Sequence, residues 1–300
     1  KEFEGIIGWN PSYFGGCGMP CSTFSSSDEG AEKDSKRFQE AFDIEEELQS
    51  ECFNVENLQS KECGPNCPVE NISLYDAIHY TNQLSKKDNL PPCFELRNVM
   101  CTDGTKADDP SSCMNNKQKG IGSAKVSLNS SKIESCLGYR LLTDTEWEYV
   151  ARAGSIRDLP AIKDNKGTNL SQMGCEVDSS LDNMAIYGGN SRGMPHDVAT
   201  KEPNIFGLYD TVGNVWEWVY KPMNHEVRSR ENSESNKNKR SSIHEKVDGK
   251  EFKIMGGSWL EFASYCRIGE YSSMSPGDKD PSTGFRIAIT IPQKPNKVVE

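Results

Sequence analysis

The chain has 300 residues, of which 35% are hydrophobic, and a formal net charge of −11; this length suits one large domain with loops. The negative charge disfavours nucleic acids and anionic membranes as partners, because both would repel it. No apolar stretch approaches the roughly 20 residues that a membrane-crossing helix requires, so we expect a protein that does not span a membrane.

Cysteines are unusually frequent, with eleven in the chain. Two pairs have CxxxC spacing, in CGMPC (Cys17, Cys21) and CGPNC (Cys63, Cys67). This content predicts disulfides and an extracytoplasmic location, whether secreted, periplasmic or at the cell surface. Zinc is the weaker alternative, because histidines are few and the spacing is three residues rather than two. The odd count leaves at least one thiol unpaired or joined to another chain.

The first quarter of the chain contains a polar, acidic segment, which is followed by a helix signal. Residues 25–61 are acidic and include the run Glu45, Glu46, Glu47, which we interpret as a solvated helix face, with a cation-binding or partner-binding surface as the alternative. A capping box at Ser73 and Asp76 predicts the start of a helix.

Residues 93–136 hold four cysteines among Gly, Ser, Asn and Asp. This composition predicts a loop that is ordered by cross-links rather than by burial. A second capping box, Thr143 with Glu146, predicts a helix that Gly154 ends. Residues 221–250 are charged, rich in Asn and Ser and almost free of apolar residues, which predicts an exposed loop.

The stretch PNIFGLYDTVGNVWEWV, residues 203–219, ends in the alternation of a short buried strand. Glu217 lies between two tryptophans, and a carboxylate stays ionised in a core only when a cation or several donors meet it. A calcium ion is one candidate, because Asp210 and the backbone near Gly213 could supply further oxygens. An arginine partner is the other.

The end of the chain predicts two more strands. Phe252 and Ile254 alternate before Gly256, and Phe285, Ile287 and Ile289 indicate a closing strand. Short strands, two helices and long cross-linked loops together favour an α+β architecture with little regular secondary structure.

Six ordered blocks carry a family resemblance: NPSYF, CPVENISLYDAIHY, GYRLLTDTEWEYVARAG, PNIFGLYDTVGNVWEWV, GGSW and TGFRIA. They resemble the sulfatase-modifying factors, which include the formylglycine-generating enzymes, from about Trp9 to Thr290. The resemblance implies a C-type-lectin-like fold and one domain over residues 1–300, with insertions at 25–61, 93–136 and 221–250. Lys1–Phe14 then corresponds to the family's first helix, the opening strands of the family are missing, and a neighbouring chain could supply such a strand.

The resemblance also locates a reaction centre. Active members have two cysteines, five residues apart after the GGS segment, which bind copper and oxidise a sulfatase cysteine to formylglycine. Here Cys266 matches the second, but Glu261 occupies the place of the first. Because monovalent copper prefers two thiolates, we expect no copper and no oxidase activity. Cys266 could instead form a disulfide, remain a buried or free thiol, or bind metal weakly.

By resemblance, structural calcium would use two sets of oxygens. The first set comprises the Asp210 side chain, the carbonyls of Gly213 and Val215, and Glu217. The second comprises Asn183, the Met184 carbonyl, Asn190 and the Arg192 carbonyl.

Two functional hypotheses follow. The first is a calcium-stabilised binding or structural protein without catalysis, in contact with a protein partner or with neighbouring subunits of a surface assembly. Its recognition surface would lie near Glu261 and include Ser258, Trp259, Tyr265 and Arg267, because related bacterial proteins diversify this region for binding. Core packing is the alternative for Trp259. The second hypothesis is a copper-dependent formylglycine-generating oxidase.

Overall fold

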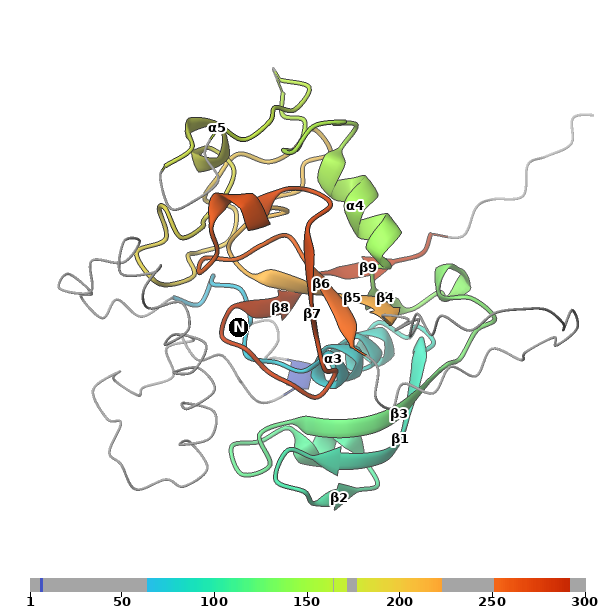
Figure 1. Cartoon of the computed structure of the whole chain (residues 1–300). Helices are drawn as coiled ribbons and strands as arrows, with labels where there is room; N and C mark the ends of the chain where they lie inside the picture. Colours follow the sequence, from blue (N-terminus) through green and yellow to red (C-terminus); the bar gives the residue numbers. More distant parts are fainter. Residues whose placement is uncertain (1–5, 8–63, 164, 172–176, 223–250, 292–300) are drawn as a thin grey trace, which may run out of the picture.

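The computed structural model describes residues 6–7, 64–163, 165–171, 177–222 and 251–291. Its α-helices are α3 (Leu74–Lys87), α4 (Asp144–Arg152) and α5 (Ser179–Asp182), and its 3-10 helices are η2 (Pro110–Cys113), η3 (Ile133–Ser135) and η4 (Ala263–Cys266). The strands are β1 (Phe94–Cys101), β2 (Lys106–Ala107), β3 (Ile121–Leu128), β4 (Tyr139–Leu141), β5 (Trp216–Pro222), β6 (Phe252–Met255), β7 (Tyr271–Met274), β8 (Thr283–Phe285) and β9 (Ile287–Ile289). Short elements joined by long irregular segments confirm the α+β prediction (Figure 1).

Three small sheets organise the described residues. The central sheet has the order β7-β6-β5-β8, in which β5 is antiparallel to β6 and parallel to β8. A two-stranded sheet pairs β4 with β9, and a three-stranded sheet has the order β2-β1-β3. Glu217 in β5 pairs with Met255 on one side and Gly284 on the other. Glu217 therefore lies on an inner strand of the central sheet, with a paired strand on each side.

Helix α3 lies between the three-stranded sheet and the central sheet (Figure 1). Its predicted capping box is present, since Ser73 and Asp76 each accept the other's backbone N–H. Leu74 and Ile78 are fully buried in one apolar cluster with residues of β1, β3 and β5. The helix thus joins the two sheets through a shared core.

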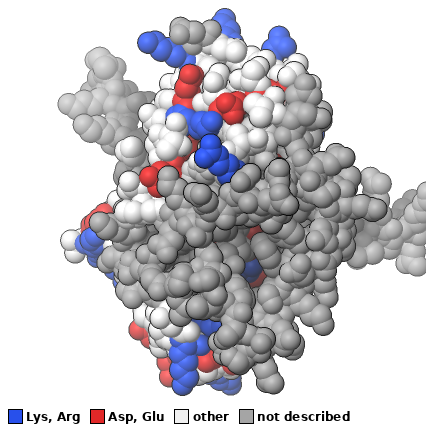
Figure 2. All heavy atoms as spheres, turned by 90° about the vertical axis from the view of Figure 1, so that its left-hand side faces the viewer, with Lys and Arg blue, Asp and Glu red and all other residues white. Residues whose placement is uncertain are grey.

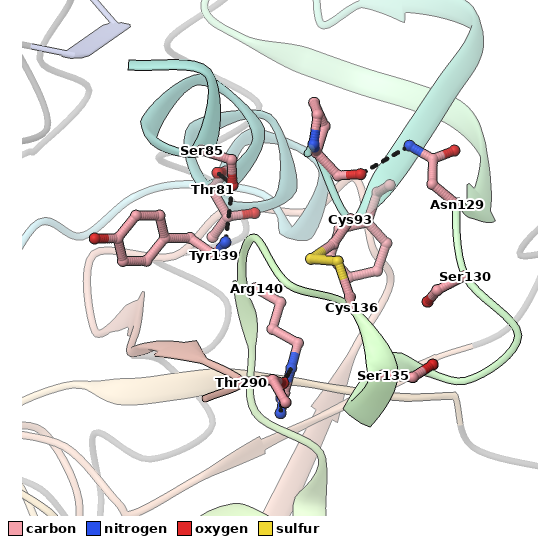
Figure 3. The surroundings of a disulfide bond; sticks show 12 residues. Thr81, Ser85, Cys93, Asn129, Ser130, Ser135, Cys136, Tyr139, Arg140 and Thr290 are labelled. Atoms are coloured by element: carbon pink, nitrogen blue, oxygen red, sulfur yellow. Dashed lines mark hydrogen bonds between the residues drawn. A yellow bond between two sulfur atoms is a disulfide. The ribbon is translucent and has the colours of Figure 1, made fainter. Parts of the chain in front are cut away.

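The segment 93–136 is more regular than predicted. Its cross-links are confirmed, with disulfides Cys93–Cys136 (Figure 3) and Cys101–Cys113. The prediction of a loop was wrong, however, because the segment contains β1, β2 and β3. The buried side chains Phe94, Val99, Ile121, Ala124 and Val126 of β1 and β3 pack into the cluster with α3, whereas Met100 is exposed.

Helix α4 begins with the predicted capping box, Thr143 with Glu146. It ends at Arg152, where Ala153 and then Gly154 adopt left-handed backbone conformations, with φ of 46° and 87°. Trp147 in this helix is almost fully buried and packs into a second apolar cluster beside the central sheet. The helix thereby places the Trp147 indole next to β5.

The predicted closing strand is divided in two. β8 pairs with β5, whereas β9 pairs with β4, and Arg286 lies at the break between them. A residue at such a break belongs to neither ladder, so its side chain can turn towards the central strand.

Several predicted features lie outside the described residues. These are the cysteines Cys17, Cys21 and Cys63, the segment 25–61, residues 223–250 and most of Lys1–Phe14, of which residues 6–7 are described and helical. β5 extends to Pro222, so residues 221 and 222 lie in a strand rather than in the predicted loop. Cys67 is in a disulfide whose partner is not among the described residues. No described helix has both the length and the apolar character needed to cross a membrane.

Candidate functional site

A cavity of about 400 Å³ lies at the start of β5, where the turn before this strand meets the break between β8 and β9. Most of its wall is apolar, and its polar residues are Asp210, Asn214, Glu217 and Arg286. Three residues of the first predicted calcium set line it, namely Asp210, Val215 and Glu217. Cavities of this size accommodate small ligands.

The Glu217 carboxylate is held by three donors. Arg286 Nη2 donates to Oε1 at 2.7 Å and Arg286 Nε donates to Oε2 at 2.9 Å. The Trp147 indole N–H donates to the same Oε2 at 2.6 Å. The arginine partner that the sequence left as an alternative is therefore present, and Glu217 is a buried charge with a bidentate counter-ion.

Arg286 also reaches the turn before β5. Its Nη2 donates to the carbonyls of Tyr209 and Asp210, at 2.8 and 3.3 Å. Burial acts to lower the pKa of Arg286, but the charge and hydrogen bonds of Glu217 outweigh burial, so the pKa is raised. The guanidinium thus remains charged and ties the C-terminal strands to the turn.

Asp210, in the turn before β5, has one buried carboxylate oxygen without a hydrogen-bond partner. Its Oδ2 accepts the Ala199 N–H at 2.7 Å, whereas Oδ1 is buried and has no partner. Burial raises the pKa of this carboxyl, although the Ala199 N–H and Arg286 oppose the shift. A buried carboxylate oxygen without a partner is costly unless a cation meets it.

The turn that carries Asp210 has an unusual backbone. Asp210, Gly213 and Asn214 all have positive φ, of 54°, 75° and 64°, a conformation that non-glycine residues adopt only at a cost. A Cβ on Gly213 would lie 2.3 Å from the Ile186 carbonyl oxygen, so only glycine fits there. Strained turns of this kind cluster at functional sites.

The first calcium set fits a cation in part. Two carboxylates face one guanidinium, which leaves one uncompensated negative charge and one unpartnered carboxylate oxygen, Asp210 Oδ1. In contrast, Glu217 already has its hydrogen bonds. Among the described residues, no group of three or more His, Cys, Asp or Glu is close enough to hold a metal, so calcium here would depend on backbone carbonyls as well.

In the second calcium set, the Asn190 side chain already has partners within the protein. The Asn190 amide donates to Asp182 and to the Ala185 carbonyl, and its Oδ1 accepts the Tyr187 N–H. Asn183 is exposed at the end of α5, and its carbonyl accepts the Glu202 N–H. Met184 is buried and Arg192 is exposed. Protein partners therefore use the Asn190 groups that calcium would need.

Glu261 and Cys266, which occupy the positions of the family's cysteine pair, both contact the protein core. Glu261 Oε1 accepts the Trp216 indole N–H at 3.0 Å, and the Glu261 carbonyl accepts the Gly188 N–H at 2.8 Å. Cys266 is fully buried and is the free cysteine among the described residues. Burial raises its pKa far above the usual range of a thiol, and the charge of Glu261 adds to the effect. Of the alternatives left open, the buried free thiol is the one observed.

The four predicted ligand-binding residues differ in accessibility. Ser258 and Trp259 are buried, and the Trp259 indole donates to the Pro281 carbonyl and packs with Ile186 and Val215. Tyr265 is 44% exposed. Arg267 is partly buried and pairs with Glu270 at 2.7 Å. Core packing, the alternative for Trp259, therefore describes it, and Tyr265 is the member of the set most available to a ligand.

Three residues of the site were not predicted, namely Trp147, Asn214 and Arg286. Asn214 anchors the turn, since it exchanges side-chain bonds with the His196 backbone and its carbonyl accepts the Trp259 N–H. The one available signal was the arginine inside the apolar pattern of TGFRIA, because a charge within a buried strand needs a partner. Charged side chains elsewhere are mixed in sign, as the described residues on one face show (Figure 2).

Comparison with known proteins finds a matching family. Residues 31–291 match the family described as sulfatase-modifying factor enzyme 1-like domain. The chaperone protein LppX of Paenibacillus barcinonensis is 25% identical over 241 residues, which are 75% of this chain and 70% of that protein. The formylglycine-generating enzyme of Mus musculus is 29% identical over 156 residues, 50% of this chain and 39% of the enzyme. The chain spans 39% to 49% of the length of the formylglycine-generating enzymes that it matches.

Among solved structures, variable protein 1 of Treponema denticola is similar over 96% of this chain and 80% of that protein. The TM-score is 0.54 and the sequence identity is 25%. The similarity covers nearly the whole chain and supports the same fold.

Proposed function

Since the chain belongs to the sulfatase-modifying factor family, we propose that it is a binding or structural protein that keeps the scaffold of a formylglycine-generating enzyme without its copper oxidase reaction. The observation that carries this proposal is the pair Glu261 and Cys266, which stand where active relatives have two thiols. Fold alone does not transmit an activity, so the chemistry of the site decides.

Both members of this pair are poor ligands for monovalent copper. A carboxylate is a hard ligand, whereas this ion prefers thiolates, and the Glu261 oxygen is engaged by Trp216. Burial raises the pKa of Cys266, so without a metal the thiol stays protonated at neutral pH and is a poor nucleophile. The described residues hold no second free thiol near it. We therefore derive no oxidation step for this chain.

The relatives are consistent with a binding role. One relative is named as a chaperone and another as a variable protein, whereas others are named as formylglycine-generating enzymes. The family thus includes proteins with names other than that of the oxidase. We extend the binding role to this chain and assign its recognition surface to the 3-10 helix η4, which bears Tyr265, next to Glu261.

Calcium is part of the proposal, at the first set only. Asp210, the carbonyls of Gly213 and Val215, and Glu217 would hold it, and it would neutralise the charge that Arg286 leaves uncompensated. Its role would be structural, because it fixes a strained turn at the start of β5. Thermal melting with calcium and with a chelator tests this, and an unchanged midpoint would show that calcium does not bind.

An oxidising location completes the proposal. The disulfides Cys93–Cys136 and Cys101–Cys113 indicate such a compartment, and we propose a secreted, periplasmic or surface protein in contact with neighbouring subunits. Native mass spectrometry of material from its source would detect such an assembly. A monomer in that measurement would remove the assembly from the proposal.

The decisive experiment compares the natural protein with Glu261→Cys and, as a control, Glu261→Ser. Each is loaded with monovalent copper under reducing conditions, analysed for metal, and incubated with oxygen and a peptide that contains CxPxR. We expect no copper and no conversion with the natural protein or with Glu261→Ser, and copper binding with Glu261→Cys. Conversion of the peptide by the natural protein would refute the proposal and establish the oxidase.

A further inference from the structure

The turn at residues 204–208 presents two large apolar side chains to solvent. Ile205 is 53% exposed and Phe206 is 49% exposed. Tyr149 of helix α4 is exposed as well, and the centroid of its ring lies 5.8 Å from that of the Phe206 ring. Large apolar side chains that gather on a surface mark places where another molecule binds. We refer to Tyr149, Ile205 and Phe206 as the apolar knob.

One buried residue holds this turn in place through its hydrogen bonds. The Asn204 side-chain oxygen accepts the N–H groups of Phe206 and Leu208. Its amide nitrogen donates to the carbonyls of Val150 and Ala151 in helix α4. The Asn204 backbone N–H also donates to the Leu208 carbonyl. The turn is therefore fixed before any partner arrives, which reduces the entropy that binding would cost.

The residues that follow the knob line a hollow. Residues 207–209 form part of the wall of the cavity of about 400 Å³. Val198 and Tyr209 in this wall are both partly exposed, so the cavity lies at the protein surface. Val69 and Phe285 belong to the apolar part of the wall. The cavity is larger than a phenyl ring and can accommodate an aromatic side chain from another molecule.

A knob and a hollow on the same turn fit a second copy of this chain. In a dimer with two-fold symmetry, both partners contribute the same patch, so the patch has to be complementary to itself. Phe206 and Gly207 are consecutive residues, yet the first belongs to the knob and the second to the cavity wall. Self-association explains why one surface carries both shapes, whereas an unrelated partner would need only one of them.

We propose that the chain forms a symmetric dimer in which Phe206 of each copy enters the cavity of the other. The phenyl ring packs against the apolar wall, which includes Val198 and Phe285, and the apolar surface removed from water drives association. The proposal rests on the contact with neighbouring subunits proposed above and names the surface that makes it. The formal net charge of −11 opposes association, so the dimer is weakest at low salt.

Sedimentation velocity of the 300-residue chain over a concentration series measures the dimer. We expect a micromolar dissociation constant that decreases as salt is added, because salt screens the repulsion between the copies. Phe206→Ala should raise this constant about thirtyfold or more, since both aromatic contacts are lost. Leu137→Ala, at a similarly exposed apolar residue outside the knob and the cavity, should leave it unchanged. A dimer that weakens as salt is added would contradict an apolar interface.

A mixing experiment tests the reciprocal insertion. Val198→Trp places a bulky side chain at the exposed rim of the cavity and should weaken the dimer as Phe206→Ala does. An equimolar mixture of the two variants should associate about fivefold or more tightly than either variant alone, because the intact Phe206 of one meets the open cavity of the other. Circular dichroism at low concentration checks the folding of each variant, and both altered side chains are partly exposed in the natural protein.

The outcomes separate this inference from the function beneath it. A monomer at every concentration overturns the dimer, while native mass spectrometry of source material still tests an assembly with other subunits. A dimer that persists in both variants, as a disulfide between copies would, overturns this interface while contact between subunits stands. A mixture that associates no more tightly than its components overturns the reciprocal insertion. None of these results bears on the copper argument at Glu261.

Discussion

Arg286 donates two hydrogen bonds, of 2.7 and 2.9 Å, to the Glu217 carboxylate. These bonds connect the break between β8 and β9 to strand β5 in the middle of the central sheet. We expect Arg286→Met to destabilise the protein by about 3 to 5 kcal/mol, because it leaves the Glu217 charge buried without its counter-ion. Urea unfolding measures this. The double variant with Glu217→Gln should cost less than the sum of the two single variants, and strict additivity would contradict the direct pairing.

The effect of Asp210→Asn on thermal stability should depend on whether calcium is present. Because the pKa is raised in the folded protein, the native state binds more protons than the unfolded state just above the ordinary carboxyl pKa, and stability falls as pH rises through that window. We therefore expect Asp210→Asn to raise the melting temperature at neutral pH in chelator. In calcium, the variant should lose the calcium-dependent increase. Lower stability of the variant in both conditions would contradict the unpartnered charge.

Acid should destabilise the protein through His79. Burial lowers the pKa of His79 from 6.5 to about 4, against the opposing charges of Asp76 and Asp109 and with a small contribution from Lys86. The unfolded state then binds more protons between these two values, so stability is full above about pH 6.5 and falls by roughly 3 kcal/mol towards pH 4. His79→Gln should flatten this part of a chemical-denaturation profile. An unchanged profile in His79→Gln would remove this residue as the cause.

The two disulfides should contribute unequally to stability. Cys93–Cys136 spans 43 residues and Cys101–Cys113 spans 12. On chain-entropy grounds, replacing each pair by alanines should cost about 4 and about 3 kcal/mol, respectively. Denaturation of the two double variants measures the difference. A larger loss from the shorter loop would indicate that packing at η2, rather than loop closure, dominates.

The residue patterns alone determined features that depend on local chemistry. The helix starts at Ser73 and Thr143 follow from capping boxes, in which both partners lie within one turn of the chain. The cross-linking within residues 93–136 follows from cysteine content, and the family follows from six ordered blocks. The loss of the thiol pair is likewise visible in the sequence, because Glu261 replaces one of its members.

The tertiary structure decided which distant groups meet. Spacing along the chain left both a metal and an arginine possible for Glu217, and only the fold brings Arg286 from 69 residues away onto its carboxylate. The same holds for Trp147, which approaches from helix α4. Asn190 matched a calcium ligand by position, yet the fold turns its amide towards Asp182. A buried charge needs a partner, and the packing of the core decides which group lies close enough to be that partner. Such contacts join residues far apart in the chain, so local sequence patterns do not encode them.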